Sequence, residues 1–505
     1  MTIYNINLGI GWASSGVEYS QIYRSRIFDC LEEPAKFVFV DLILNENIAH
    51  FTQNIGFRDE DIIWMYLYFT DIKLRATSYR LADVKATLAH PIEEEKREGD
   101  QIVRLYYDHG HQYATCYLVE GSNDLVNRVE FVVNGYLVRK DYYSYTRFLS
   151  EYYAPKDSKA KLYLRRFFNE DGSVAYEEMV DGDHSCFKMS DAILYNKEEL
   201  FAYFIQKLEL TEEDVVILDR ATGTGQAVFQ YAPPAKIGVV IHAEHFSEGP
   251  TTDDYILWNN YYDYQFMHSD AVDFFIASTQ AQKEVLDQQF AHYYDKKAKV
   301  YAIPVGSISE LKYPQPGERQ AFNLMTASRL AAEKHVDWLV EVVARVKPEI
   351  PQIHFDIYGK GAKENSLREL IKELGAEDYI QLRGHQNLEQ IYQKYDLYFA
   401  GSTSEGFGLT LLEAIAAGLP IIGFEVNYGN VTFVEDGVNG YLIPYQPGDD
   451  PESYVENLAN YLLKYYQEAD RQAMQEASYQ RAKDFLDEKI IAAWRNLLKE
   501  VREND

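Results

Sequence analysis

"YDLYFAGSTSEGFGLTLLEAIAAGLPIIGF", from Tyr395 to Phe424, contains the elements of an α/β fold in a single run. Its first part, Tyr395–Gly401, and its last part, Pro420–Phe424, each have the length and apolarity of a buried strand. Between them, apolar residues at helical spacing predict a helix, and Gly418-Leu419-Pro420 marks its end. The apolar stripe of this helix consists of Leu411, Leu412, Ile415, Ala416 and Leu419. Strand, helix and strand in this order predict a parallel sheet, in which ligands bind beyond the carboxyl ends of the strands.

Two glutamates, Glu405 and Glu413, lie on either side of the start of this helix. The turn between strand and helix consists of Gly406, Phe407 and Gly408. The first helical amides, of Gly408, Leu409 and Thr410, have no intrahelical partner and suit a phosphate. Carboxylates repel a phosphate, but they accept hydrogen bonds from hydroxyl groups on either side of it. The pattern favours a nucleotide sugar; two solvated surface glutamates are the alternative, because 79 acidic residues produce such pairs by chance.

Strand candidates alternate with helix-length segments on both sides of this stretch. From Phe322 onward, FNLMTASRL, HFDIYG, YIQLRG and GYLIP continue the same series. An earlier α/β series comprises the strand candidate Ile3–Ile10, a helical stretch after Gly16, the apolar run Phe37–Leu44, and the segments DVVILDR, AKIGVVIHAEH and AVDFFIAST. Residues 66–190 differ, because short β-branched and aromatic runs alternate there with turn signals, which predicts an antiparallel meander.

These patterns predict an α/β protein with two doubly wound, Rossmann-like domains and an inserted antiparallel β-meander domain. The N-terminal Rossmann-like domain is expected over residues 1–65 and 195–310. The inserted sheet is expected over 66–194. Residues 311–490 are expected to form the C-terminal Rossmann-like domain that binds the nucleotide sugar, and residues 491–505 the end of a C-terminal helix.

Composition excludes several classes of function. The net charge of -30 argues against sequence-independent nucleic-acid binding and against a polybasic membrane anchor. The three cysteines have no C-x-x-C spacing, so neither a zinc site nor a disulfide framework is indicated. The start of the chain lacks the pattern of a signal peptide, and no apolar run has the length of a membrane span. We therefore expect a soluble, cytoplasmic protein.

A second cluster of candidate residues follows the strand LMTAS in the same domain. Arg329 and Lys334 are placed there at the strand's carboxyl end, where two cations can neutralise a diphosphate and the charge that develops on it as it leaves. A pair of surface cations is the alternative. Arg329 and Lys334 follow a strand of the same predicted sheet as the glutamate turn, which favours a common site at the carboxyl ends of the strands.

The first domain offers weaker candidates. Gly16 could close over the diphosphate, and His242, after the buried strand IGVVI, could hydrogen-bond the sugar or serve as a satisfied core histidine. The turn RATGTGQ, Arg220–Gln226, lacks the G-x-G-x-x-G spacing of a dinucleotide site and is assigned no ligand.

Together these motifs resemble family 4 retaining glycosyltransferases with the GT-B fold. SEGFGLTLLEA resembles their E-x7-E signature, SRLAAEKHVDWL their Arg/Lys diphosphate motif, and YAIPVGSI their inter-domain linker. The resemblance covers roughly residues 200–490. The inserted sheet and the segment IHAEHF further resemble the members that add N-acetylglucosamine to Ser/Thr of serine-rich repeat adhesins in the accessory Sec export system of Gram-positive bacteria.

The resemblance implies a role for each candidate residue. Glu405 faces the donor sugar, Glu413 the ribose, and Arg329 and Lys334 the diphosphate, while His242 faces the sugar from the other domain. The remaining donor contacts implied are Gly16, Val17, Glu18 and Tyr19; Arg383, Gly384 and His385 beside the uracil; and Gly406, Phe407, Gly408, Leu409 and Thr410. In many relatives a Gly-Gly pair precedes the acidic residue of the first loop, where this chain has Ser15-Gly16.

The resemblance also implies the ligands and partners. The donor is UDP-N-acetylglucosamine (UDP-GlcNAc), used without a metal or other cofactor, and the acceptor is an unfolded Ser/Thr-rich adhesin polypeptide. A homologous, non-catalytic subunit is the expected partner, with peripheral contact at the inner face of the cell membrane. Two alternatives are another UDP-sugar-dependent transferase acting on a polymer and a non-catalytic, chaperone-like paralogue; a nucleotide-sugar epimerase is a third. The tyrosine-rich inserted sheet is predicted to bind the acceptor, although core or dimer contacts are equally compatible with its composition.

Overall fold

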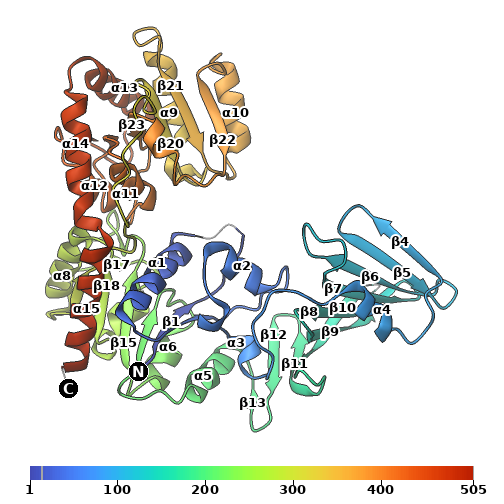
Figure 1. Ribbon diagram of the computed structural model, residues 1–505. Coiled ribbons are helices and arrows are strands. Elements are labelled where there is room, and N and C mark those ends of the chain that lie inside the picture. The colour runs from blue at the N-terminus through green and yellow to red at the C-terminus, as the bar shows by residue number, and fades with distance from the viewer. Residues whose placement is uncertain (13–14, 158, 504–505) are drawn as a thin grey trace. The chain divides into compact units, whose positions relative to one another are not determined.

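The computed structural model describes residues 1–12, 15–157 and 159–503. The chain divides into two compact units (Figure 1). The first comprises residues 1–28, 32–239 and 270–272, and the second comprises residues 29–31, 240–269 and 273–505. None of the helices in the described ranges is both long and apolar enough to cross a membrane.

A parallel sheet forms the core of one half of the first unit. Five of its strands lie side by side in the order β15-β14-β1-β2-β3. They are β1 (Ile3–Asn7), β2 (Ala35–Phe39), β3 (Ile62–Trp64), β14 (Val215–Leu218) and β15 (Lys236–Ile241). The accompanying helices are α1 (Gly16–Leu31), α2 (Ile48–Ile55), α3 (Met65–Tyr68), α5 (Lys197–Lys207) and α6 (Gly225–Tyr231). Strands and helices alternate along the chain, which confirms the α/β prediction for this part.

The first two strands are shorter than predicted. The first, expected to continue to Ile10, ends at Asn7, and the second, expected over Phe37–Leu44, ends at Phe39. The amides at positions 40 and 41 both donate to the carbonyl of Leu8, at 2.9 and 2.7 Å, and so belong to a turn rather than to the ladder. Apolar residues continue past the strand end because they also fill buried loops, so an apolar run alone does not locate the end.

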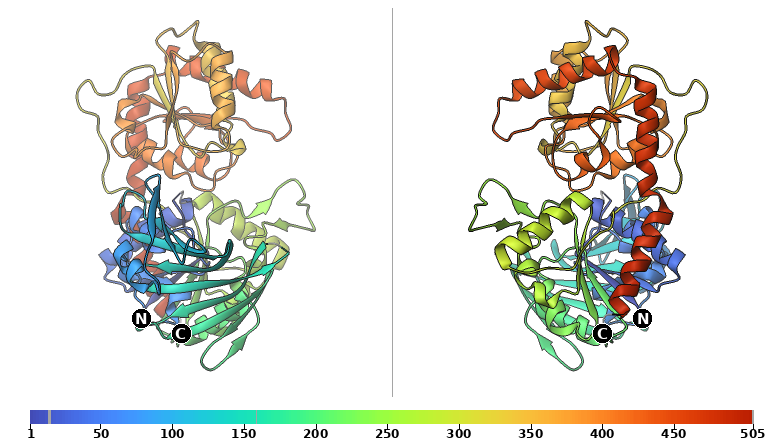
Figure 2. Two further views of the ribbon diagram at one scale, coloured as in Figure 1. Left: turned by 90° about the vertical axis from the view of Figure 1, so that its right-hand side faces the viewer. Right: turned by 90° about the vertical axis from the view of Figure 1, so that its left-hand side faces the viewer.

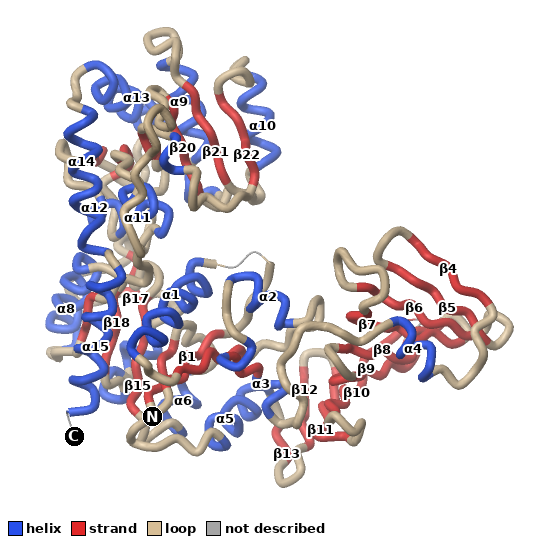
Figure 3. Tube along the Cα trace, viewed as in Figure 1, coloured by secondary structure: helices blue, strands red, loops and turns tan. Residues whose placement is uncertain are grey.

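An antiparallel sheet of ten strands forms the other half of the first unit (Figure 3). Its strand order follows the sequence from β4 to β13, as the predicted meander requires. The strands are β4 (Glu94–Glu98), β5 (Ile102–Tyr107), β6 (Gln112–Leu118), β7 (Val126–Val133), β8 (Tyr136–Tyr143), β9 (Arg147–Lys156), β10 (Lys159–Phe168), β11 (Val174–Asp181), β12 (His184–Lys188) and β13 (Ile193–Leu194). Helix α4 (Leu81–Thr87), which the sequence pattern did not predict, packs Leu81 and Val84 into the apolar cluster of strands β5 to β8.

A row of alternating charges crosses this sheet. Strand register places Glu130, Lys140, Glu151, Arg165 and Glu178 opposite one another on successive strands. The Lys140–Glu130 pair measures 3.0 Å, and Arg165 lies 2.9 Å from Glu151 and 3.0 Å from Glu178. Opposite charges directly across a strand pair stabilise a sheet, and here they also fix its register.

A six-stranded parallel sheet forms the core of the second unit, in the order β22-β21-β20-β23-β24-β25. Its strands are β20 (Asn323–Ala327), β21 (His354–Tyr358), β22 (Ile380–Gly384), β23 (Leu397–Phe399), β24 (Ile421–Phe424) and β25 (Gly440–Ile443). The helices between and after them are α9 (Val336–Val346), α10 (Glu364–Glu373), α11 (Leu409–Ala416), α12 (Gly429–Phe433) and α13 (Pro451–Gln467). The stretch Tyr395–Phe424 thus forms β23, α11 and β24, as predicted.

Both faces of this sheet are covered, and Figure 2 shows helices on either side of it. Leu397 and Phe399 of β23 belong to the apolar cluster that contains α9, α10 and α13. Tyr398, between them, belongs to the opposite cluster, which contains α11. Alternate residues of one strand therefore serve two cores, and only the strand ends and their loops remain for a ligand.

Further helices and strands of the second unit come before β20 or after α13 in the sequence. Two come directly after β15, the paired strands β16 (Phe246–Ser247) and β17 (Leu257–Trp258). The others are α7 (Asp263–Met267), β18 (Phe274–Ala277), α8 (Gln280–Tyr294), β19 (Val300–Ala302), α14 (Arg471–Ala482) and α15 (Asp487–Glu503). β18 and β19 pair in parallel.

Candidate active site

Glycines bring three loops together at the carboxyl edge of the six-stranded sheet. A Cβ added to Gly359, after β21, would lie 1.9 Å from the carbonyl oxygen of Ser328, after β20. A Cβ on Gly401, after β23, would lie 2.8 Å from the carbonyl oxygen of Lys334. Side chains do not fit at such distances, so these positions require glycine. The loop that carries Arg329 and Lys334 is consequently held between its two neighbours.

The turn around Glu405 is equally close-packed. Gly408 has φ +88° and immediately precedes α11, and a Cβ on Gly406 would lie 2.7 Å from the carbonyl oxygen of His242. The carbonyl of Glu405 accepts hydrogen bonds from the amides of Tyr428, at 2.7 Å, and Gly429, at 2.8 Å. The predicted glycine turn therefore fixes the main chain of Glu405 and lies directly against the segment that follows β15.

Glu405 and Lys334 form an ion pair at this edge. Nζ of Lys334 lies 2.7 Å from Oε2 of Glu405, and their side chains are 15% and 20% exposed. Arg329 points outward, with a side chain that is 76% exposed and an ion pair to Glu333 at 3.2 Å. The structure thus places both predicted cations on the loop beside Glu405, one joined to it and one at the surface.

The first turn of α11 completes this edge. The hydroxyl of Tyr398 donates to the carbonyl oxygen of Ala327 at 2.8 Å and lies 2.9 Å from Oγ1 of Thr410. Leu409 packs on the segment that contains Gly306, where an added Cβ would lie 2.3 Å from Cδ2 of Leu409. Phe407 is buried in the cluster around α11. The helix N-terminus is thereby held rigidly, with the partial positive charge of its dipole directed toward the loops of Glu405 and Lys334.

Glu413, one turn inside the same helix, has a different environment. The hydroxyl of Tyr392 donates to its Oε2 at 2.7 Å. Burial raises the pKa of Glu413, while the Tyr392 hydrogen bond and the charge of Lys312 act in the opposite direction. A half-buried carboxylate with one bound hydroxyl retains further acceptor capacity for hydroxyl groups of a ligand.

The predicted base-binding turn lies at the end of β22. Nε of Arg383 donates to Oδ1 of Asp356 at 2.8 Å, and the hydroxyl of Tyr395 donates to Oδ2 of the same carboxylate at 2.6 Å. The carboxylate of Asp356 raises the pKa of Arg383. Gly384 has φ +70°, and His385 beyond it is exposed. Arg383 is therefore fixed in direction, whereas His385 is open to solvent.

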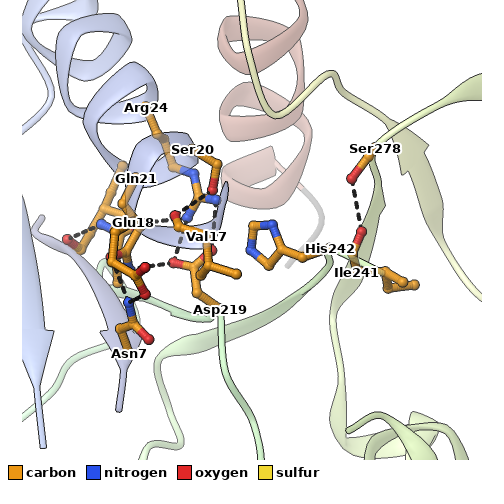
Figure 4. Close-up of polar contacts among 12 residues, drawn as sticks. Asn7, Val17, Glu18, Ser20, Gln21, Arg24, Asp219, Ile241, His242 and Ser278 are labelled. Atoms are coloured by element: carbon orange, nitrogen blue, oxygen red, sulfur yellow. Dashed lines mark hydrogen bonds and ion pairs between the residues drawn. The ribbon is translucent and has the colours of Figure 1, made fainter. Parts of the chain in front are cut away.

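The segment after β15 carries His242, which is half-buried. Its backbone amide and that of Ala243 both donate to the hydroxyl of Tyr262, at 2.9 and 3.1 Å. Gln282 donates to the carbonyl of Ala243 at 2.9 Å. These bonds fix the main chain that presents the side chain of His242, whose ring is drawn in Figure 4.

Sequence reasoning did not single out Glu244 and His245 of the same segment. Burial raises the pKa of Glu244, whose carboxylate accepts a hydrogen bond from Ser404 beside Glu405. His245 is fully buried and its Nδ1 lies 3.2 Å from the hydroxyl of Tyr428. No local pattern reveals this contact, because the two residues lie 183 positions apart in the chain.

In the first unit, the predicted donor loop begins α1. Gly16 is the first helical residue and is exposed, Val17 is half-buried, and Tyr19 is 38% exposed. The carboxylate of Glu18 is buried and accepts hydrogen bonds from the amide and hydroxyl of Ser15, both at 2.6 Å. This is one half of a capping box, in which the acidic residue of the first turn accepts from the backbone at the helix start.

A polar network next to this loop includes the carboxylate of Glu18 (Figure 4). Nδ2 of Asn7 donates to Glu18 at 3.0 Å, Nε2 of Gln21 donates to Asp219 at 2.8 Å, and Arg24 donates two hydrogen bonds to Asp219 at 2.8 and 2.9 Å. Arg220, in the turn RATGTGQ, donates to Oγ of Ser15 at 2.8 Å. That turn therefore supports the loop of α1.

Comparison with known families matches two segments of the chain. The family described as "Glycosyl transferases group 1" matches residues 314–481, and the family described as "GtfA extended beta-sheet domain" matches residues 94–191. The first segment contains the six-stranded parallel sheet, and the second corresponds to the ten-stranded antiparallel sheet.

Whole-length relatives are also found. The UDP-N-acetylglucosamine–peptide N-acetylglucosaminyltransferase GtfA subunit of Streptococcus gordonii is 52% identical over 505 residues, which cover 100% of this chain and 99% of the relative. The GtfA subunit of Limosilactobacillus reuteri is 39% identical over 99% of this chain and 100% of the relative. A crystal structure of the pneumococcal O-GlcNAc transferase GtfA, in complex with UDP and GlcNAc, superimposes with a TM-score of 0.95 at 50% identity, covering 100% of this chain and 99% of that one.

Proposed function

The chain belongs to the GtfA family of UDP-N-acetylglucosamine–peptide N-acetylglucosaminyltransferase subunits, and on this premise we propose that it transfers GlcNAc from UDP-GlcNAc to Ser and Thr hydroxyls of a polypeptide. The observation that carries the proposal is the Lys334–Glu405 ion pair beside the first turn of α11. A cation and a helix N-terminus suit a diphosphate, and an adjacent carboxylate suits sugar hydroxyls.

The proposed reaction retains the configuration of the sugar. The bond between the anomeric carbon and the β-phosphate oxygen breaks, and a bond from that carbon to the acceptor oxygen forms on the same face. The acceptor proton passes to the departing phosphate oxygen. Lys334, Arg329 and the first amides of α11 stabilise the negative charge that develops on UDP as it leaves.

The other candidate residues fit parts of the same donor. Glu413 accepts hydrogen bonds from the ribose hydroxyls, and Arg383, Gly384 and His385 lie beside the uracil. His242, with its main chain fixed by Tyr262, hydrogen-bonds the sugar. The loop that begins at Gly16 contributes backbone amides to the donor.

The acceptor is proposed to be an unfolded, Ser/Thr-rich adhesin polypeptide. A chain that is 52% identical to this one over its full length has been crystallised in a GtfA/B complex, and we propose a homologous, non-catalytic GtfB subunit as the partner here. The proposed place of action is the cytoplasm, with peripheral contact at the inner face of the cell membrane. The proposed reaction uses no metal or other cofactor.

We also propose that the ten-stranded sheet binds the acceptor. Tyr136 and Tyr163 expose 47% and 48% of their surface there, and tyrosine combines an apolar ring with a hydroxyl that hydrogen-bonds a polar peptide. Replacing both with Ala is expected to reduce peptide glycosylation while leaving hydrolysis of UDP-GlcNAc by water unchanged. Tyr313→Ala, which removes an exposed tyrosine of the other unit, is the matched control. Equal losses of both activities would contradict this role, and the assay is run with and without the partner subunit.

Mass spectrometry tests the transfer reaction itself. A Ser/Thr-rich polypeptide is incubated with the protein in three separate reactions, each with one donor: UDP-GlcNAc, UDP-glucose or UDP-galactose. Each reaction is run in the presence and absence of the partner. The expected result is addition of N-acetylhexosamine from UDP-GlcNAc alone. Transfer of a different sugar, or transfer only to a non-protein polymer, would overturn the proposed donor or acceptor.

A further inference from the structure

The turn of Glu405 is joined to the segment after β15 through one buried histidine. His245 has no exposed surface, and its Nε2 lies 2.8 Å from Oε1 of Gln289 on α8. On its other side, Nδ1 lies 3.2 Å from the hydroxyl of Tyr428. The rings of His245 and Tyr428 stack, with centroids 5.6 Å apart and planes inclined by 22°.

The partners of the imidazole determine its tautomer. Because an amide oxygen only accepts, Nε2 of His245 carries the proton and donates to Gln289, and Nδ1 accepts from the Tyr428 hydroxyl. Burial lowers the pKa of His245 to about 4, so the ring is neutral at physiological pH. The hydrogen bond from Tyr428 to His245 therefore has a fixed direction.

Tyr428 continues this connection to Glu405 through the backbone. Its amide and that of Gly429 donate to the carbonyl oxygen of Glu405, at 2.7 and 2.8 Å. A Cβ on Gly429 would lie 2.9 Å from Cγ of Glu405, so the main chain passes directly beside that side chain. The carboxylate of Glu405 then binds Lys334 at 2.7 Å. Hydrogen bonds that meet at Tyr428 and at Glu405, on different atoms of each residue, thus connect Gln289 to Lys334.

The His245–Tyr428 pair lies among aromatic side chains. Trp258 and Phe266 surround the imidazole, with ring centroids 6.1 and 6.2 Å from it. Burying polar groups among aromatic rings carries a desolvation cost, and well-packed apolar replacements of buried polar groups are often neutral or stabilising. What the polar pair adds is a defined direction, because a hydrogen bond fixes the relative orientation of the two side chains whereas apolar packing does not.

We propose that His245 and Tyr428 are positioning residues for sugar transfer, and that their hydrogen bond fixes the Glu405 turn against the segment that presents His242. This inference rests on the proposed function, which places the sugar beside Glu405 and His242. A small displacement of such groups is costly, since misplacement by about 1 Å can reduce a rate by roughly 100-fold.

Two substitutions of one residue test the direction of the bond. The side-chain oxygen of asparagine is as many bonds from Cα as Nδ1 of histidine, so it can accept where Nδ1 accepts. The side-chain amide nitrogen of glutamine is as many bonds from Cα as Nε2, so it can donate where Nε2 donates. His245→Asn therefore keeps an acceptor for the Tyr428 hydroxyl, and His245→Gln keeps only the contact toward Gln289. We expect kcat for peptide glycosylation to stay within about threefold of wild type in His245→Asn and to fall roughly tenfold in His245→Gln, an increase in barrier of about 1.4 kcal/mol. KM for UDP-GlcNAc is expected to be unchanged in both.

Tyr428→Phe provides an independent variant that keeps the ring and removes the hydroxyl. We expect the same roughly tenfold loss of kcat. The double variant His245→Gln/Tyr428→Phe is expected to show no additional loss, because both substitutions remove the same hydrogen bond. Tyr465→Phe is the matched control: its buried hydroxyl donates to the carbonyl of Asp396 at 2.8 Å, so it loses a comparable hydrogen bond away from the turn. Its kcat is expected to equal that of wild type, and thermal unfolding of every variant shows that each is folded at the assay temperature.

Several results would overturn the inference. They are equal kcat in His245→Asn and His245→Gln, losses that multiply in the double variant, and a Tyr428→Phe enzyme as active as Tyr465→Phe. Glu405→Gln separates this inference from the proposed function. If Glu405→Gln transfers at the wild-type rate, the proposed site itself fails; if it is inactive while the two His245 variants are equal, only the positioning role fails.

Discussion

Two strand-to-helix loops of this chain each carry a glutamate, and the two carboxylates have very different surroundings. Glu18, in the loop after β1, has a side chain that is 4% exposed and accepts hydrogen bonds from Ser15 and Asn7 on both of its oxygens. Glu405, in the turn after β23, is 20% exposed and is joined to Lys334 through one oxygen. The first carboxylate holds its own loop together, whereas the second retains acceptor capacity for a ligand.

This contrast shows that a position next to the start of a helix is not enough to identify a carboxylate that binds a ligand. Both loops follow a parallel strand and precede a helix, where a ligand is expected. The difference lies in hydrogen-bond saturation: a carboxylate whose acceptor sites are filled by its own loop has little left for a sugar. We therefore expect substitutions at the two positions to act on different quantities, activity at Glu405 and stability at Glu18.

The largest effect is expected for Glu405→Gln. The amide keeps the shape of the side chain and removes the charge, so transfer is expected to fall roughly 100- to 1000-fold, as for loss of one group that stabilises developing charge. The melting temperature is expected to stay close to that of wild type. Initial rates of peptide glycosylation and thermal unfolding measure the two quantities. Glu369→Gln, exposed on α10, is the control, and wild-type rates in Glu405→Gln would remove Glu405 from the site.

Lys334→Ala is expected to have the next largest effect, on donor affinity. It removes a cation from the proposed diphosphate site and leaves the Glu405 carboxylate to repel the phosphates, which we expect to weaken UDP binding by about 3 kcal/mol. Uridine, which has no phosphate, is expected to bind as it does to wild type. Calorimetry with both ligands measures this difference, and equal losses for UDP and uridine would show that Lys334 does not contact the diphosphate.

Glu413→Ala tests the second glutamate of the same helix. Loss of a charged hydrogen bond to the ribose is expected to weaken binding by roughly 1.5–3 kcal/mol. In contrast to Lys334→Ala, this loss is expected for uridine as well as for UDP. Titration of both ligands checks it, and an effect confined to UDP would assign Glu413 to the phosphates instead of the ribose.

Glu18→Gln tests the other side of the comparison. The substitution places an amide where the two oxygens of Glu18 accept from Ser15 and Asn7, and we expect the free energy of unfolding to fall by about 1–2 kcal/mol. Chemical denaturation measures this loss, with the exposed Glu212→Gln of the same unit as the control. Unchanged stability together with weakened donor binding would reverse the assignment and make Glu18 a ligand-binding group.

Arg329→Ala is expected to have the smallest effect. Its side chain is 76% exposed and pairs with Glu333 at the surface, where ion pairs contribute about 1 kcal/mol or less. Affinity for UDP is expected to fall less than tenfold, and affinity for uridine not at all. A loss for UDP as large as that of Lys334→Ala would show that Arg329 contributes as much to diphosphate binding as Lys334 does.

Periodicity identified the main elements of the fold. The run Tyr395–Phe424 predicted β23, α11 and β24, because buried parallel strands and an amphipathic helix leave distinct patterns. The ten-stranded meander was likewise visible in its turn signals. The strand end at Phe39 and the short helix α4 were not, because turns within apolar runs and short helices leave weak periodic signals.

The candidate site was predictable where its residues are close in sequence. Glu405 and Glu413 belong to one recognisable motif. Lys334 belongs to a second motif, and its side chain contacts Glu405 in the structure. His245 and Tyr428 were not predicted, because their contact joins segments 183 residues apart and depends on the folded main chain. The hydrogen bond from Asn7 to the carboxylate of Glu18 was not predicted either, since no sequence pattern reports how many hydrogen bonds a carboxylate accepts.

A crystal structure of the chain with bound UDP-GlcNAc tests the central claim most directly. The account predicts the diphosphate within hydrogen-bonding distance of Lys334 and the first amides of α11, with the sugar hydroxyls on Glu405. The carboxylate of Glu18 is predicted to remain bonded to Ser15 and Asn7. A donor bound away from the 401–413 segment, for example at the turn Arg220–Gln226, or a Glu18 carboxylate that leaves Ser15 to bind the donor, would contradict it.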